Sequence, residues 1–164
     1  MITIRELKSE DDLPGILSLC KDFFTEYESY HGEFFDLDNL TDEDLSGRFV
    51  ESIESNNSAT FVALVDNVIV GYAAVDVRDQ PDFYKVKKVG AIWGLMVDKN
   101  HRRRGIASHL LEKARGYFQQ KGIKYFTLYT AVANKGAIEF YKNNGLNPLH
   151  MAFIGENENE KTDK

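Results

Sequence analysis

Hydrophobic positions in the first part of the chain predict a strand followed by two helices. Residues 2–7 alternate between apolar and polar side chains, which is the period of a half-buried strand. Residues 9–12 then supply a capping serine and acidic side chains ahead of apolar residues at helical spacing. Thr41, with Asp44 three residues later, resembles a capping box and predicts a second helix that continues to Ile53.

The middle of the chain is apolar and rich in β-branched residues, which predicts a sheet. Residues 58–65 and 68–77 form two such runs on either side of an Asp-Asn pair, which has the chemistry of a tight hairpin turn. Residues 89–97, VGAIWGLMV, predict a further strand that contains two glycines. Because a glycine inside a strand often marks a bulge, we expect a bulge at Gly94.

The last third of the chain predicts two more helices separated by a strand. Apolar residues at helical spacing predict a helix from about Arg104 that ends at Gly122, and residues 125–130 predict a strand. Asn134 can cap a short helix, and residues 146–154 then have a strand-like pattern. This order of elements predicts a mixed α/β (α+β) fold.

Length and charge limit the number of domains and the kinds of partner. The 164 residues, 43% of them apolar, suit one core, so we assign residues 1–155 to a single domain and 156–164 to a charged, disordered tail. A formal net charge of -6 argues against binding to nucleic acid or to a membrane surface. The first residues have no signal-peptide pattern, so we expect a cytoplasmic protein.

Cysteine and histidine give no indication of a disulfide or a metal site. Cys20 is the only cysteine and lies on the apolar side of the first predicted helix, which predicts a buried thiol. His31 and His101 have no second ligand at a spacing that is typical of metal sites. We therefore expect no metal.

The stretch from residue 100 to 114, NHRRRGIASHLLEKA, is the first candidate for chemistry. A strand that ends near Val97, a basic loop and a helix opened by Gly105 direct several backbone N–H groups and a positive helix end to one point. Such a point binds phosphate groups well. The spacing matches neither the P-loop nor the dinucleotide fingerprint, so a different phosphorylated cofactor is implied.

This loop resembles the pyrophosphate motif of the GCN5-related N-acetyltransferase (GNAT) superfamily, which is Arg or Gln, two residues, Gly, one residue, and Gly or Ala. Residues 102–107, RRRGIA, fit that motif. The Gly-Leu-Met-Val-Asp before it is similar to the family's bulged fourth strand, and residues 134–146 are similar to its second acetyl-CoA motif. The resemblance implies a mostly antiparallel, twisted sheet of about seven strands, splayed at strand 4 and flanked by about four helices.

The resemblance also implies acetyl-CoA as the cosubstrate. Its pantetheine would pair with the fourth strand, and its pyrophosphate would bind backbone N–H groups of the loop, so the shape of the loop matters more than the arginine side chains. Asn134 would help to hold the pantetheine, although it can equally be only a helix cap. The implied cofactor residues are Leu95, Met96, Val97, Arg102, Arg103, Arg104, Gly105, Ile106, Ala107, Ser108, Asn134, Ala137 and Tyr141.

Tyr141 holds the position of the family's frequent tyrosine acid, which would give a proton to the leaving thiolate, and its alternative role is packing. Residues 125–130 carry no carboxylate where several relatives have a glutamate base. We therefore expect a water chain or an acid from the N-terminal half, with Glu33, Asp36 and Asp76 as candidates, to take the amine proton. The candidate acceptor residues are Tyr30, Glu33, Asp36, Tyr84 and Tyr129.

The leading hypothesis is an N-acetyltransferase that moves the acetyl group to a primary amine of a small molecule or peptide by direct transfer in a ternary complex. A protein lysine or N-terminal acetyltransferase is one alternative, and a non-catalytic acyl-CoA-binding module is another. Relatives are often dimers, and residues 146–154 can either complete their own sheet or pair across a homodimer. Fold resemblance does not identify the acceptor.

Overall fold

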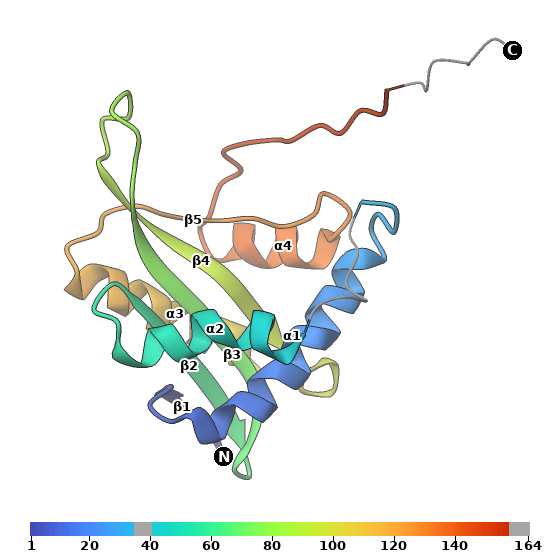
Figure 1. The fold of residues 1–164 in the computed structure, drawn as a ribbon, viewed down its shortest axis with the longest axis vertical. Coiled ribbons are helices and arrows are strands. Elements are labelled where there is room, and N and C mark those ends of the chain that lie inside the picture. Colours follow the sequence, from blue (N-terminus) through green and yellow to red (C-terminus); the bar gives the residue numbers. More distant parts are fainter. Residues whose placement is uncertain (35–40, 158–164) are drawn as a thin grey trace, which may run out of the picture.

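A computed structural model describes residues 1–34 and 41–157, and it contains one twisted sheet with helices on both faces (Figure 1). Two single-turn 3-10 helices, Glu10–Asp12 and Lys99–His101, lie between these elements. The strands are β1 (Ile2–Glu6), β2 (Ser58–Val65), β3 (Val68–Asp79), β4 (Lys88–Val97) and β5 (Phe126–Leu128). The helices are α1 (Leu13–Glu28), α2 (Asp42–Glu54), α3 (Ile106–Gln120) and α4 (Lys135–Asn143).

The sheet follows the order of the chain, β1-β2-β3-β4-β5. The first three pairings are antiparallel, and β4 pairs with β5 in parallel. The predicted mixed and mostly antiparallel sheet with four helices is therefore confirmed, although the described residues form five strands and not about seven.

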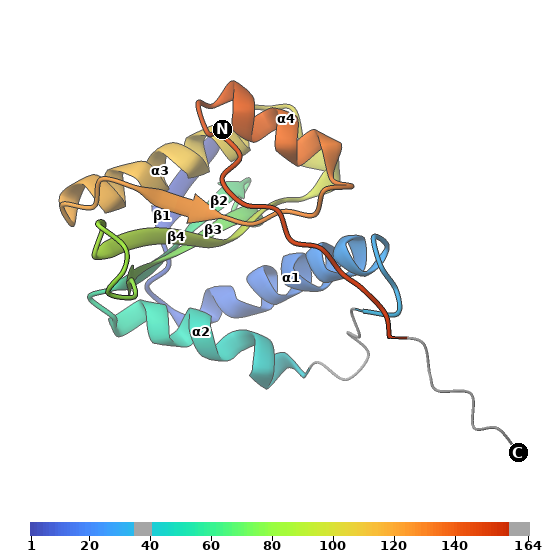
Figure 2. The same ribbon diagram turned by 90° about the horizontal axis from the view of Figure 1, so that it is seen from above.

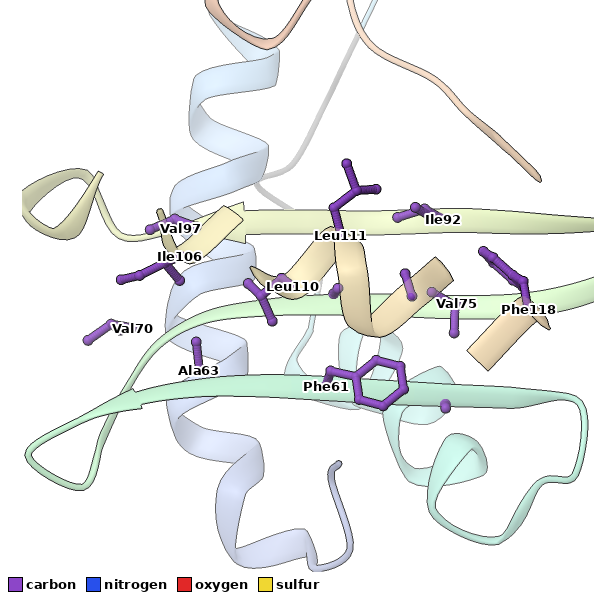
Figure 3. Close-up of a cluster of buried hydrophobic side chains, with 13 residues drawn as sticks. Phe61, Ala63, Val70, Val75, Ile92, Val97, Ile106, Leu110, Leu111 and Phe118 are labelled. Atoms are coloured by element: carbon purple, nitrogen blue, oxygen red, sulfur yellow. The ribbon is translucent and has the colours of Figure 1, made fainter. Parts of the chain in front are cut away.

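Two apolar layers hold the helices against the sheet. Helices α1 and α2 lie on one face and α3 and α4 on the other (Figure 2). On the second face, Ile106, Leu110 and Phe118 of α3 pack over side chains of β2, β3 and β4 (Figure 3). On the first face, Cys20 is buried as predicted, and its thiol donates a hydrogen bond to the Tyr72 hydroxyl at 3.4 Å.

Several local predictions are confirmed because they depend only on neighbouring residues. Thr41 and Asp44 form the expected capping box, with the Asp44 N–H 3.1 Å from Thr41 Oγ1 and the Thr41 N–H 3.0 Å from Asp44 Oδ2. Asp66 and Asn67 both have positive φ angles, 51° and 63°, as the hairpin turn between β2 and β3 requires.

The prediction of a strand at residues 146–154 is wrong. The segment forms no strand in the described part of the chain, and residues 147–157 are exposed and extend away from the sheet (Figure 1). Pro148 has no N–H to donate, and β5, with three residues, offers only a short edge for pairing. Of the predicted tail, residues 158–164 lie outside the described residues.

Candidate functional site

The sheet splays between β4 and β5, and a cleft opens where the two strands separate. Strand β5 pairs with β4 only from Gly90 to Ile92, so β4 continues toward Val97 with β3 as its described neighbour. The cleft has a volume of about 660 Å³ and is lined by α1, the end of β4, the loop that follows it, the segment after β5, and α4. The splay at strand 4 was predicted from the resemblance and is confirmed.

A β-bulge shapes the floor of this cleft. Ala74 pairs with Gly94 and Val75 pairs with Ile92, which leaves Trp93 as the extra residue of β4, so the bulge expected at Gly94 is confirmed. Trp93 packs on the core that faces α1 and α2, and a Cβ on Gly94 would point to the same core. The bulge therefore places these two neighbours on one face of the sheet.

The loop after β4 leaves N–H groups open at one end of the cleft. Arg103 and Gly105 have positive φ angles of 62° and 80°, which turn the chain sharply into α3. The N–H of His109 bonds to the Gly105 carbonyl at 3.0 Å, so the N–H groups of the preceding residues have no helical acceptor. Ile106, Ala107 and Ser108, which carry three of these groups, line the cleft.

Asp98 stabilises the start of the same loop. Its Oδ1 accepts a hydrogen bond from the Asn100 N–H at 2.9 Å and lies 2.8 Å from Nδ1 of His101. The hydrogen bond with His101 lowers the pKa of the Asp98 carboxyl group below its usual value. The loop thus begins with an ionised carboxylate that fixes its first turn.

Arg102 uses its guanidinium group to hold the loop in place. Its Nε donates to the Val97 carbonyl at 3.0 Å, and its Nη2 lies 2.6 Å from Glu26 Oε1 on α1. Arg103 lines the cleft, whereas Arg104 is not among the lining residues. The first arginine of the motif therefore joins β4, the loop and α1.

Helix α4 forms the opposite wall. Asn134 caps it by accepting a hydrogen bond from the Ala137 N–H at 3.1 Å. Tyr141 lines the cleft beside Phe140, with 5.5 Å between the ring centroids. Burial raises the pKa of Tyr141 to about 12, so its hydroxyl keeps a proton at neutral pH and can donate it.

Aromatic side chains make up the end of the cleft next to α1. Phe23 and Tyr27 of α1 and Tyr30 just after the helix line it, with ring centroids 5.7 Å apart between Phe23 and Tyr27 and 5.9 Å apart between Tyr27 and Tyr30. Trp93 lines it from the floor, and Tyr129, 79% exposed, lines it after β5. This end of the cleft suits a ligand that is partly apolar.

The structure brings most of the sequence-predicted residues into one cleft. Every residue assigned to the cofactor lines it except Arg104, and among the acceptor candidates Tyr30 and Tyr129 do so. Glu33 and Tyr84 are not lining residues, and Asp36 lies outside the described residues.

Asp76, a candidate base, also does not line the cleft. It accepts hydrogen bonds from Arg48 at 2.8 Å and from Arg78 at 2.6 Å. Asp76 therefore belongs to an ion-pair cluster with two guanidinium groups.

Sequence reasoning missed part of the aromatic end of the cleft. Phe23 and Tyr27 precede Tyr30 by seven and three positions, so the helical spacing of these aromatic residues was a usable signal. Trp93 gave no such signal, because one step of strand register decides which face it joins. Glu26 was missed because its partner Arg102 is distant in the chain.

The described residues have neither a membrane-spanning helix nor a metal-binding cluster. They contain no helix that is both long and apolar enough to cross a membrane. They also contain no group of three or more His, Cys, Asp or Glu side chains arranged to hold a metal ion.

Comparison with solved structures shows which fold this is. An aminoglycoside N-acetyltransferase, AAC(6')-Iy in complex with CoA, superposes with a TM-score of 0.77 over 96% of this chain and 95% of that one. The two sequences are 18% identical. At this identity the likeness concerns the fold alone.

Comparison of sequences gives the family. An uncharacterized N-acetyltransferase from Methanocaldococcus jannaschii is 31% identical over 87% of this chain, which spans 59% of that protein's length. An uncharacterized N-acetyltransferase from Archaeoglobus fulgidus is also 31% identical, over 76% of this chain and 84% of its own length. The model of the acetyltransferase (GNAT) family matches residues 17–146. The chain therefore belongs to the acetyltransferase (GNAT) family.

Proposed function

We propose that the protein is an acetyl-CoA-dependent N-acetyltransferase that transfers the acetyl group directly to a primary amine of a small molecule or peptide. The observation that carries this proposal is the single cleft at the splay, which joins open loop N–H groups to an aromatic end. The two substrates can thus meet in one ternary complex. Membership of the family supports the reaction class.

The cofactor fits the loop end of the cleft. Backbone N–H groups at the start of α3 suit a pyrophosphate, because they combine open donors with the positive end of the helix. Beyond Ile92, β4 has main-chain groups on its open side that can pair with the amides of a pantetheine arm. The CoA complex of the related fold supports this assignment.

The reaction needs a neutral amine and a proton for the leaving thiolate. Tyr141, which lines the cleft and keeps its proton at neutral pH, suits the role of proton donor. The aromatic residues at the other end offer ring faces against which the carbon body of an amine can pack.

We also propose that two copies associate through residues 146–154. Leu149, Met151 and Phe153 alternate along this segment and are exposed, Phe153 to 90%. An exposed apolar run of this kind is typical of an interaction site. Light scattering should therefore give the mass of a dimer, and the variant Leu149→Lys/Phe153→Lys should give that of a monomer. A monomeric wild type would refute the association.

Ligand-dependent thermal stability tests the cofactor part of the proposal. Acetyl-CoA and CoA should raise the Tm of the wild type, whereas ATP should not, because a ligand that binds the folded state stabilises it. Gly105→Glu should abolish the rise, because a side chain at this position, where φ is 80°, strains the turn that presents the loop N–H groups. Gly122→Glu is the matched control, because Gly122 also has a positive φ, 69°, but lies at the far end of α3. No rise at saturating acetyl-CoA would refute the proposal.

An amine panel then tests the transfer. Release of free CoA thiol from acetyl-CoA should require a primary amine and should be lost in Gly105→Glu. Release with peptides alone would favour a protein acetyltransferase. Tight binding of acetyl-CoA without thiol release across the panel would favour an acyl-CoA-binding module.

A further inference from the structure

The indole of Trp93 is an aromatic surface of the cleft that residues of α2 hold in place. It lines the cleft from the bulge in β4. The guanidinium carbon of Arg48 lies 4.1 Å from its ring centroid, and Phe49 packs on it at 5.0 Å with the rings inclined by 45°. Arg48 and Phe49 of α2 therefore fix the orientation of the indole.

Arg48 is itself held by an ion-pair cluster. Asp76 on β3 accepts from Arg48 Nη2 at 2.8 Å, and it also accepts from Nε and Nη2 of Arg78 at 2.6 Å and 3.0 Å. This cluster keeps Arg48 over the ring. The orientation of Trp93 is thus set by residues that do not line the cleft.

The charges around this aromatic end do not favour a second cation. Among the described lining residues, the carboxylates are Glu26 and Glu139. Glu26 is paired with Arg102 at 2.6 Å, and Glu139 is exposed on α4. The indole already has the cation of Arg48 on its ring, which weakens the attraction that its face offers to another cation.

We propose that Trp93 selects the acceptor, and that the acceptor is a primary amine attached to an apolar or aromatic body. This inference rests on the proposed acetyltransferase function and names the substrate class of the same cleft. The body of the acceptor packs between Trp93 and the side chains of Phe23, Tyr27 and Tyr30, which lie on α1 and just after its end.

Fluorescence tests the contact directly, because Trp93 is the only tryptophan of the chain. The measurement uses CoA-saturated protein, so that no transfer occurs, and titrates it with phenethylamine or with putrescine. Phenethylamine should change the emission of Trp93 in a saturable way at concentrations where putrescine does not. An emission that responds to neither amine, or to putrescine alone, would overturn the proposal.

Variants separate selection from stability. Trp93→Leu should raise KM for phenethylamine about ten-fold, the value of a lost aromatic contact, and change KM for acetyl-CoA by less than about two-fold. Tyr125→Leu, which alters a half-exposed aromatic residue outside the cleft, is the matched control and should change neither. Arg48→Met should raise the acceptor KM about two- to five-fold, because it removes a cation–π contact. Equal effects of Trp93→Leu on both KM values would overturn the proposal.

A further variant controls for loss of folding. The turnover measurements also distinguish failure of the acceptor class from failure of the acetyltransferase function. Trp93→Phe keeps a ring at the site and should still prefer phenethylamine to putrescine by kcat/KM. A preference for putrescine in the wild type would refute the acceptor class while leaving the acetyltransferase function in place. No thiol release with either amine, together with no rise of Tm with acetyl-CoA, would refute the acetyltransferase function itself.

Discussion

The substitution Gly94→Ala should damage both the stability of the sheet and the cleft. A Cβ at Gly94 would lie 2.7 Å from Cε2 of Tyr72 and 3.3 Å from its hydroxyl oxygen. Tyr72 is 2% exposed, packs edge-on against Phe49 at 5.5 Å and accepts a hydrogen bond from Cys20. Because the ring is held on all these sides, the backbone of β4 must move instead.

The size of the effect follows from overpacking a buried site. One extra methyl group in a closely packed core costs about 1–3 kcal/mol of unfolding free energy. In a chain of this size, each kcal/mol lowers Tm by about 2–4 °C. Since the displaced backbone carries the bulge and the edge of β4 that lines the cleft, KM for acetyl-CoA should rise as well.

Gly90→Ala provides the matched control. A Cβ at Gly90 would lie 2.5 Å from Cε1 of Phe118, an equally severe clash on the same strand. Gly90 does not line the cleft, and Phe118 belongs to the core under α3. Both variants should therefore unfold at lower temperature, but only Gly94→Ala should bind acetyl-CoA more weakly.

The assay pairs calorimetric unfolding with kinetics below the lower of the two Tm values, so that both variants are folded. The reasoning would be refuted if Gly94→Ala unfolded at the wild-type temperature. It would also be refuted if Gly90→Ala raised KM for acetyl-CoA as much as Gly94→Ala did. Either result would mean that the close approach to Tyr72 does not fix the shape of the cleft.

Further predictions concern three residues in the walls of the cleft. Tyr141→Phe should lower kcat about 100-fold with little change in KM. The wild-type pH profile should show no loss from ionisation of Tyr141 below about pH 10, because burial raises its pKa to about 12 and the group is almost fully protonated two units below its pKa. Asn134→Ala should cost about 1 kcal/mol in urea unfolding, and Asn134→Asp should restore most of it as a helix cap. Arg102→Lys should weaken CoA binding in calorimetric titration, because lysine cannot bond Val97 and Glu26 in the same geometry.

The fold was predictable where a few adjacent residues determine the backbone. The turn at Asp66 and Asn67 and the cap at Thr41 depend on local chemistry, and both form as expected. Residues 146–154 show the limit of such patterns, because an alternating segment becomes a strand only where an edge is available to pair with it. The sequence specifies the apolar side chains of this segment but not their partner.

The two ends of the cleft also differ in how far local sequence predicts them. The loop end was predictable because the glycine and the small residues at the start of α3 define it within a few positions. The aromatic end depends on the register of a bulge at Trp93 and on an ion pair between Glu26 and Arg102, which come from different elements. Such long-range pairing leaves no trace in local spacing.

The same long-range pairing bears on how the amine proton is removed. A carboxylate base must be free to accept a proton, and Glu26 and Asp76 are each held by arginine, with Asp76 outside the cleft. In the proposed reaction, Trp93 and its neighbours hold the acceptor on one side of the cleft, and Tyr141, whose pKa burial raises to about 12, holds the proton for the leaving thiolate on the other. Acceptor recognition and proton donation then use residues of the same cleft.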